Sequence, residues 1–385
     1  MEWKIRETKT IRMQIDRRAV ENFDWLYFWV VTALSVIGVL TIFSATRPMP
    51  GHPHSHYYIK QLVWMVIGFG TMLLMMKLDY KWFGIFAPPL FVFGLVMLVF
   101  VLFKGHMGLG AQRWVSIGGI SFQPSEIFRI AFILMIARQL SMAKPPIGIS
   151  KFLRMTPLVV LLPLGLLVKQ PDLGTAITMG AVFLFTCLSR GMSKKLLIAL
   201  FIFGIVSLPF FWDIFWHGFL KDYQRNRLVA FLDPSVDPAG IGYHLNQSKI
   251  AIGSGMLFGK GYLHGTQGPF RFLPEKHTDF IFSVFAEEWG FIGSLVLLGL
   301  YFVLLWRTLD TARKAKDDFG AMLATAVAFM FAFYLFFNIG MTMGMLPVVG
   351  IPLPFMSYGG TSLLANFIAA GLVLNVRQRR FELFY

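Results

Sequence analysis

One acidic residue, Asp279, stands where a long polar stretch of the chain runs into an apolar segment. The junction reads LPEKHTDFIF over residues 273–282. A charged group at the edge of a membrane costs free energy, so such a group is usually functional. A carboxylate placed there can accept a proton from an attacking alcohol or hold a divalent cation. The plainer interpretation is a helix cap, with Asp279 in the first turn of the following helix and His277 on the surface.

Two earlier motifs also place acids beside basic or polar groups. QRW at 112–114 precedes QPSE at 123–126 and Arg129. Ser125 or its neighbour can cap a helix there, and Glu126 lies three residues before Arg129, on the same helical face. QPDLGT at 170–175 puts Asp172 at the start of another helix, where it would complement the positive end. A buried ion pair and a helix cap explain these motifs equally well.

The polar stretch, residues 217–278, carries Arg225 and Arg227 and five closely spaced glycines between residues 253 and 265. These glycines allow tight turns or a close approach of substrate to the backbone, unless the segment is a flexible linker. Residues 243–256 are typical of an amphipathic helix at a membrane surface. Beyond Asp279, Glu287 and Glu288 are expected to be buried structural acids.

The last motif, PFMSYGG at 354–360, contains Ser357 and Tyr358. Its proline and glycine content predicts a non-helical turn or re-entrant segment packed inside the protein. Its amides and hydroxyls could bind a sugar or phosphate, or only complete the turn. Three histidines at 52, 54 and 56 have a spacing suited to a metal on a helix, but Pro53 argues against that helix.

The composition requires a membrane protein. Of 385 residues, 56% are hydrophobic and 14% are charged, and the mean hydropathy is +0.64. An apolar run of about 20 residues crosses a bilayer as a helix. The sequence predicts an all-α polytopic fold with about ten such helices, the fifth and sixth being short: 25–44, 58–76, 82–103, 125–142, 155–168, 173–188, 196–215, 280–306, 319–345 and 358–376.

The distribution of basic residues predicts the orientation, because Lys and Arg resist translocation. Few of the 35 Lys and Arg residues fall in short loops on one side, and most fall on the other. Both termini are therefore expected in the cytoplasm, with one large outer loop between helices 7 and 8. We expect a cytoplasmic basic tail at 1–22, one membrane domain at 23–376 with the loop at 217–278, and a cytoplasmic tail at 377–385.

Several functions are disfavoured by the same composition. The net charge of +15 comes mostly from short inner loops without a basic and aromatic stripe, so nucleic-acid binding is not expected. The single cysteine, Cys187, excludes an internal disulfide and gives no support to redox chemistry or structural zinc. Gly253 and Gly255 do not begin a dinucleotide-binding GxGxxG motif, because residue 258 is Phe.

Taken together, QPSE, QPDLGT, LPEKHTDFIF and PFMSYGG, in this order and on this topology, resemble the SEDS family (shape, elongation, division and sporulation). The resemblance covers the chain from the first span to the last, and residues 350–355 (GIPLPF) resemble its rod-shape branch more than its division branch. Two positions depart from the family pattern. Arg129 stands where Lys is usual, which changes hydrogen-bond geometry, and Gly268 stands where Ser is common.

The resemblance implies a peptidoglycan glycosyltransferase in the cytoplasmic membrane, with its active site on the outer side. Lipid II and the nascent glycan would be its substrates and a class B penicillin-binding transpeptidase its partner, among membrane lipids. Asp279 would be the general base or the ligand of Mg²⁺ or Mn²⁺, with no organic cofactor. Arginines would neutralise the pyrophosphate, and acids would orient them; the remaining candidates for substrate binding are Arg113, Glu126, Arg129, Asp172, Arg225, Arg227, His277, Thr278, Ser357 and Tyr358.

Two other functions stay open on the sequence alone. A lipid II flippase would need polar groups through the depth of the membrane, whereas the polar motifs here gather on the outer side, apart from Glu287 and Glu288. A non-catalytic scaffold of a cell-wall complex would have no use for the acid at position 279.

Overall fold

The chain folds into a bundle of helices in a computed structural model, which describes residues 23–47, 56–108, 111–117, 120–220, 222–233, 236–237, 240–266 and 276–380. The predicted membrane spans all coincide with helical segments. The long helices are α2 (Trp25–Ala45), α3 (Tyr57–Lys77), α4 (Tyr80–Lys104), α5 (Pro124–Ser141), α8 (Leu173–Arg190), α9 (Lys194–Asp213), α12 (Ile281–Arg313), α13 (Asp318–Thr342) and α14 (Gly360–Gln378). The short fifth span comprises α6 (Ile149–Thr156), the π-helical turn η1 (Pro157–Leu161) and α7 (Leu162–Lys169).

Eight of these segments are long and apolar enough to cross a membrane. They are α2, α3, α4, the continuous α6 to α7 segment, α8, α12, α13 and α14. Helix α5 carries Glu126, Arg129 and Arg138 within its 18 residues, and α9 also falls outside the eight. The chain is therefore a multi-pass membrane protein, while the count of ten spans and the side of each terminus stay predictions.

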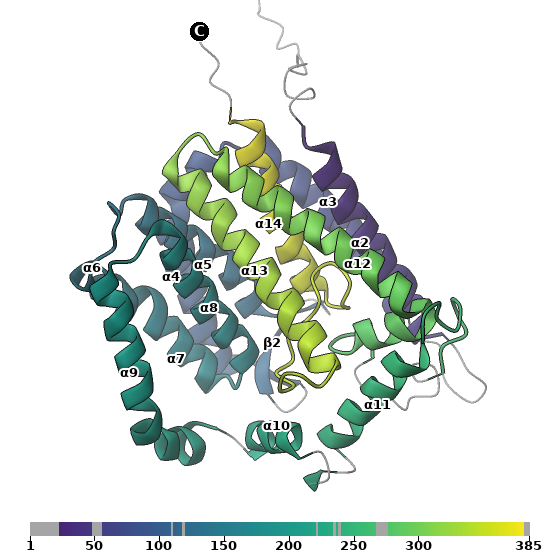
Figure 1. Cartoon of the computed structure of the whole chain (residues 1–385). Helices are drawn as coiled ribbons and strands as arrows, with labels where there is room; N and C mark the ends of the chain where they lie inside the picture. Colours follow the sequence, from purple (N-terminus) through teal and green to yellow (C-terminus); the bar gives the residue numbers. More distant parts are fainter. Residues whose placement is uncertain are drawn as a thin grey trace, which may run out of the picture.

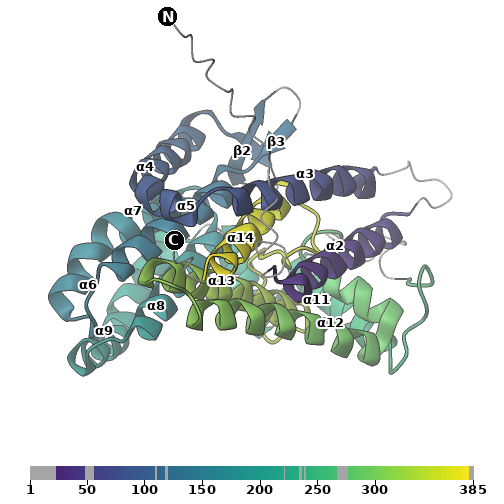
Figure 2. The ribbon, with the colours of Figure 1, turned by 90° about the horizontal axis from the view of Figure 1, so that it is seen from above.

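Helices α13 and α14 form the centre of the bundle. Figures 1 and 2 show α14 passing through the middle, between α3, α5 and α13. Its approach to α3 is close because a Cβ at Gly371 would lie only 2.8 Å from the carbonyl oxygen of Met72. Small residues allow such backbone contact between membrane helices. The outer helices instead expose large apolar side chains such as Phe93 and Phe201, as a lipid environment requires.

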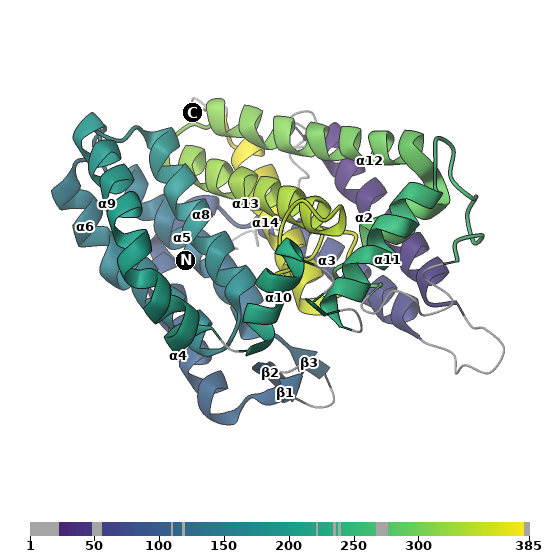
Figure 3. The same ribbon diagram turned by 60° about the horizontal axis from the view of Figure 1, so that its bottom comes forward.

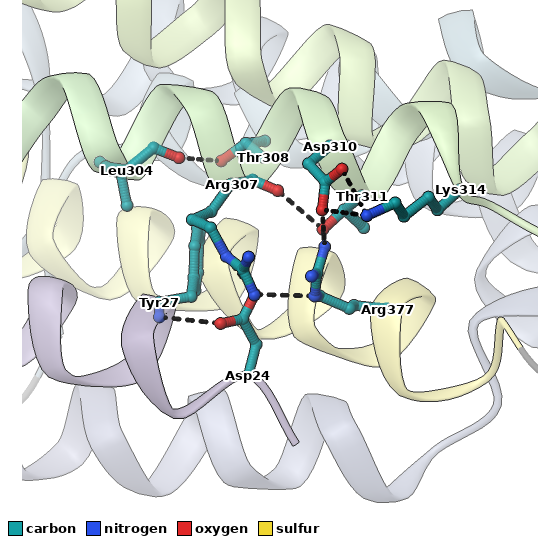
Figure 4. A network of polar contacts seen from close by, with 9 residues as sticks. All are labelled: Asp24, Tyr27, Leu304, Arg307, Thr308, Asp310, Thr311, Lys314 and Arg377. Carbon is teal, nitrogen blue, oxygen red and sulfur yellow. Dashed lines mark hydrogen bonds and ion pairs between the residues drawn. The ribbon is translucent and has the colours of Figure 1, made fainter. Parts of the chain in front are cut away.

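One end of the bundle is closed by a network of charges between α2, α12 and α14 (Figure 4). The Asp24 carboxylate lies 2.8 Å from Arg307 Nη2 and 2.8 Å from Arg377 Nε, and it accepts the Tyr27 amide. Arg377 also reaches Asp310 at 2.7 Å. We call these residues the Asp24 network. It joins the start of α2 to the end of α14, so these two helix ends lie at the same end of the bundle.

The opposite end carries the strands and the short helices, and it corrects the all-α prediction in one detail. Strands β1 (His106–Gly108), β2 (Ala111–Ile117) and β3 (Ile120–Phe122) form an antiparallel sheet in the order β1-β2-β3. The apolar Val115 and Ile117 alternate with Trp114 and Ser116 in β2, a period of two that suits a strand. The segment was too short to stand out among the long apolar runs.

Two helices and a second π-helical turn, η2 (Ile214–Phe219), belong to the region predicted as one large loop. Helices α10 (Asp222–Leu232) and α11 (Ile241–Ser254) lie across this end of the bundle (Figure 3). The predicted helix at 243–256 is thus confirmed as α11, while α10, which carries Arg225 and Arg227, was not predicted. Whether α11 lies at the membrane surface stays a prediction.

Helix α12 is broken inside the predicted eighth span. Gly290 has φ 64° and ψ −163°, a conformation that favours glycine. The amides of Phe291 and Ile292 bond instead to the carbonyls of Met256 and Leu257, at 2.8 and 3.0 Å. The glycine-rich segment after α11 therefore packs into the break in α12. This contact explains the glycines better than a linker does, because a Cβ at Gly259 would meet the Glu288 carbonyl.

Candidate active site

Asp279 lies in a turn before α12, which corrects its predicted position in the first helical turn. Helix α12 begins at Ile281, with Phe280 as its N-cap residue. The side-chain amide of Asn338 donates to the Asp279 carbonyl at 3.0 Å and to the Ile351 carbonyl at 2.8 Å. This buried amide holds the backbone of Asp279 against the turn before α14 and outside the helix. The Asp279 side chain is half-buried.

The Asp279 carboxylate and the Arg227 guanidinium both lie near Gly350. A Cβ at Gly350 would lie 3.4 Å from Asp279 Oδ2 and 3.7 Å from Arg227 Nη1. The φ of Gly350 is +73°, which an L residue adopts only with strain. The glycine thus leaves room beside both charged groups. Asp279 and Arg227 are far apart in the sequence, and the fold brings both to the Gly350 turn. Their common role in substrate binding stays a prediction.

The start of α8 packs against the same turn. A Cβ at Gly174 would lie 2.8 Å from the Val349 carbonyl oxygen and 3.6 Å from the Gly350 carbonyl oxygen. Asp172 caps α8, as predicted, by accepting the Thr175 amide at 3.4 Å. The first turn of α8, which Asp172 caps, therefore packs on the Gly350 turn.

Asp172 also organises the residues of the first motifs. Its carboxylate accepts bonds from Gln123 Nε2 and Ser125 Oγ, both at 3.1 Å, and lies 3.5 Å from Arg113 Nη1. Ser125 therefore binds Asp172 and does not cap α5, whose N-cap residue Gln123 makes no side-chain cap bond. Pro124 at the first helical position needs no such bond for its own missing N–H. The Arg113 side chain, on β2, is 20% exposed and remains accessible to a ligand.

Glu126 and Arg129 form the ion pair that their spacing predicts, with 3.0 Å between Oε2 and Nη1. Arg129 Nη2 donates to Asn366 at 2.9 Å, and the guanidinium lies 4.8 Å from the ring centroid of Tyr334. These contacts use the planar shape of Arg, which Lys at this position would lack. Because Arg129 is only 1% exposed, the arrangement suits a structural pair; its contact with substrate stays a prediction.

The PFMSYGG segment completes a turn beside Asp279, as predicted. Ser357 Oγ donates to the Thr278 carbonyl and accepts the Leu353 amide, both at 2.7 Å. The Tyr358 amide donates to the His277 carbonyl at 2.8 Å. The Ser357 hydroxyl is thus engaged within the turn. His277, Thr278 and Tyr358 remain half-buried next to Asp279.

Glu287 and Glu288 form a separate cluster with the glycine-rich segment. Glu287 Oε1 lies 2.6 Å from Lys260 Nζ and accepts the Thr266 amide at 2.8 Å. Glu288 accepts the Ser44 hydroxyl from α2. Both acids are almost fully buried. Their local partners support the prediction that they are structural acids.

Of the remaining predicted residues, some lie in the described part of the chain and others lie outside it. Arg225, on α10, donates from Nε to the Leu220 carbonyl at 3.3 Å. His52, His54 and Gly268 lie outside the described residues, as does the proposed tail at 1–22. Within the described segments, no group of three His, Cys, Asp or Glu side chains is arranged to hold a metal ion.

An apolar pocket of about 570 Å³ lies at the start of α4, lined by Leu78, Trp82, Phe83, Phe86, Pro89 and Leu90. The α3–α4 turn is at the opposite end of α3 from Tyr57, whose ring touches His277. This pocket is therefore remote from Asp279 and does not contribute to the candidate site.

Known proteins are similar to this chain both in sequence and in fold. The FtsW/RodA/SpoVE family model, described as cell cycle protein, matches residues 24–382. Peptidoglycan glycosyltransferase MrdB of Escherichia coli K12 is 40% identical over 93% of this chain and 94% of its own length. Peptidoglycan glycosyltransferase RodA of Treponema pallidum is 34% identical over 94% of this chain and 99% of its own.

Two solved structures are similar over nearly the whole chain. A chain from work on structural coordination of polymerization and crosslinking by a peptidoglycan synthase complex has a TM-score of 0.78 and 30% identity, covering 94% of this chain and 99% of that chain. The rod shape determining protein RodA of Thermus thermophilus has a TM-score of 0.68 and 29% identity, covering 94% and 98%. The family and the enzyme class predicted from the motifs are confirmed. The chain belongs to the FtsW/RodA/SpoVE family of cell cycle proteins, and the two sequence relatives reported above are peptidoglycan glycosyltransferases.

Proposed function

We propose that this protein polymerises lipid II into glycan strands on the outer face of the cytoplasmic membrane during cell elongation. The 4-hydroxyl of the acceptor GlcNAc attacks C1 of the donor MurNAc, and the bond from C1 to the pyrophosphate oxygen breaks. Undecaprenyl pyrophosphate leaves and the anomeric centre inverts. The relatives named as peptidoglycan glycosyltransferases support the reaction class.

The observation that carries the assignment of residues is the meeting of Asp279 and Arg227 at Gly350. A transferase of this kind needs a base for the attacking hydroxyl and cations for the leaving group, within reach of one substrate. Asp279 takes the proton of the acceptor hydroxyl as the new C–O bond forms. Arg227, together with Arg113 in its pair with Asp172, meets the charge that grows on the pyrophosphate.

Asp172 acts by positioning the Arg113 guanidinium beside it. Its bonds to Gln123, Ser125 and the α8 amide fix the carboxylate, which in turn orients Arg113. The oriented Arg113 guanidinium favours an anionic group, and it requires no change in the protein when the substrate arrives.

The residues present fit a divalent cation that is held by one carboxylate together with the substrate phosphates. Mg²⁺ keeps several waters and commonly takes one or two carboxylates together with substrate phosphates. Asp279 would supply that carboxylate, and the bound ion would offset charge on the pyrophosphate. The single-carboxylate arrangement does not suit a site built from protein ligands alone.

A class B penicillin-binding transpeptidase is the proposed partner. The likeness to a chain of a peptidoglycan synthase complex that coordinates polymerization and crosslinking supports this pairing. The outer position of the site is supported by the basic residues, which predict that the Asp24 network faces the cytoplasm. Asp279, at the other end of the bundle, then faces outward.

The test is glycan synthesis by the purified protein and its partner with labelled lipid II, comparing wild type with Asp279→Asn. We expect polymer from the wild type and at least about a hundredfold less from the variant, the usual contribution of a general base. Equal polymer from both would remove Asp279 from the mechanism. Polymer from neither, with lipid II crossing vesicle membranes, would support the flippase; neither activity would support the scaffold.

A further inference from the structure

Three aromatic rings gather beside Asp279 from three separate parts of the chain. The Tyr57 ring at the start of α3 stacks on His277, with centroids 4.5 Å apart and planes at 24°. Tyr358 meets Tyr57 at 4.9 Å and 70°, and meets His277 at 5.5 Å. We call Tyr57, His277 and Tyr358 the aromatic platform. Tyr57 was not among the residues predicted to bind substrate.

Hydrogen bonds to backbone groups fix the platform relative to Asp279. The Tyr358 amide bonds to the His277 carbonyl, and the neighbouring Ser357 hydroxyl bonds to the Thr278 carbonyl. From α3, Gln61 donates to the Ser357 carbonyl at 3.1 Å and accepts the Gly359 amide at 3.3 Å. Gln61 lies one helical turn from Tyr57, so one helix sets both the turn and the ring. A binding surface held this way loses little entropy when a ligand arrives.

The plain alternative is an aromatic belt, because Tyr is common where membrane helices meet water. The adjacent Tyr58 fits that description: its ring packs edge-on against Phe43 of α2 at 5.0 Å. Tyr57 differs because it contacts the segment that carries Asp279 and still leaves 36% of its surface exposed. Two neighbouring tyrosines on one helix turn thus have different surroundings.

We propose that the aromatic platform is a saccharide subsite that holds the hexosamine ring of the acceptor. A pyranose has an apolar C–H face that packs on aromatic rings, and hydroxyls at its edge that bond to a phenol or an imidazole. The platform is joined to the segment before Asp279 through the Tyr358 amide and the His277 carbonyl, whereas Arg227 lies near Gly350. An uncharged sugar suits the first position and a pyrophosphate the second.

This inference rests on the proposed function, and a soluble GlcNAc–MurNAc disaccharide separates the two. The disaccharide carries the acceptor hydroxyl and no pyrophosphate, so it accepts but cannot donate. Its binding to the purified protein is measured by saturation-transfer NMR without any turnover. Its apparent KM as acceptor is measured in the glycan assay with lipid II held at saturation.

The variants are Tyr57→Leu, Tyr57→Phe and Tyr57→Trp, with Tyr58→Leu as the matched control. We expect Tyr57→Leu to weaken disaccharide binding and raise its KM about tenfold, the size of one aromatic contact, with kcat nearly unchanged. Phe and Trp at position 57 should keep wild-type binding, and so should Tyr58→Leu. Rescue by Phe and Trp distinguishes ligand stacking from a hydroxyl bond or a general loss of packing.

Other outcomes overturn the subsite. The subsite is contradicted if the wild-type protein does not bind the disaccharide, or if Tyr57→Leu binds it as well as the wild type does. It is also contradicted if Tyr57→Leu and Tyr58→Leu lose binding equally. If Tyr57→Leu does not fold, Tyr57→Trp decides, because a larger ring that blocks binding contradicts a stacking surface. Disaccharide binding that depends on Tyr57 without glycan synthesis by the wild type would refute the proposed function and leave the saccharide subsite standing.

Discussion

Carboxylates meet arginines at both ends of the helix bundle, and the surroundings of the two sites differ. In the Asp24 network, Asp24 is 4% exposed and is enclosed by Arg307, Arg377 and the Tyr27 amide (Figure 4). At the Gly350 turn, Asp279 is half-buried, precedes its helix, and lies beside a residue with no side chain. The first acid is enclosed by protein groups, while the second is partly exposed beside a residue with no side chain.

The comparison shows that charge and burial alone do not mark the active site in this protein. The Asp24 network and the Glu287 cluster both contain buried acids close to basic groups. What distinguishes Asp279 is irregular backbone around a partly exposed carboxylate, a situation tolerated at membrane depth mainly where it lines a cavity.

The largest expected effect on stability is at the Asp24 network. Asp24→Asn leaves Arg307 and Arg377 without their shared anionic partner, and breaking a buried ion pair costs about 3–5 kcal/mol. Thermal unfolding in detergent should show a clearly lower midpoint. Lys314→Met is the matched control, because Lys314 is 56% exposed in its pair with Asp310 and such pairs contribute at most about 1 kcal/mol. Equal midpoints for both variants would contradict a structural role for Asp24.

A smaller effect, now on activity, is expected at Gly350. Gly350→Ala places a Cβ 3.4 Å from Asp279 Oδ2 at a positive φ, where an L residue costs about 1–2 kcal/mol. We expect about a tenfold lower rate of glycan synthesis if the turn shifts Asp279 by a fraction of an ångström. Gly253→Ala is the control, since nothing lies within 4 Å of its Cβ position. A Gly350→Ala enzyme with full activity would show that this turn does not set the geometry.

The effect expected at Arg113 is of similar size but falls on the KM. Arg113→Ala removes a partly exposed cation and leaves Asp172 bonded to Gln123 and Ser125. The apparent KM for lipid II should rise about tenfold, the scale of one hydrogen bond between charged groups, and Arg113→Lys should recover part of the loss. An unchanged KM in Arg113→Ala would show that this arginine has a structural role in the sheet and does not bind the substrate.

The sequence predicted the helices well because their signal is local. Each apolar run, from Trp25 in α2 to Val376 in α14, is long enough to be recognised without knowledge of its neighbours. The pair Glu126 and Arg129 was predictable for the same reason, since three residues define one helical face. The motifs also identified the family before any fold was considered.

The contacts between distant segments could not be predicted from local patterns. Asn338 holds Asp279 outside α12, and Gly290 breaks that helix because the segment at 255–261 supplies the missing carbonyls. Asp24 lies 2.8 Å from Arg377 at the other end of the chain, and Tyr57 stacks on His277. Each of these depends on the packing of several helices, which no spacing rule along one segment contains.

The most direct test measures two quantities on two variants side by side. Asp279→Asn and Asp24→Asn are purified with the partner transpeptidase, and each is scored for its unfolding midpoint and for glycan made per folded molecule. We predict that Asp279→Asn has the unfolding midpoint of the wild type but makes almost no glycan. Asp24→Asn should have a lower unfolding midpoint, while its folded fraction still polymerises lipid II. Glycan from Asp279→Asn at the wild-type rate would contradict the central claim.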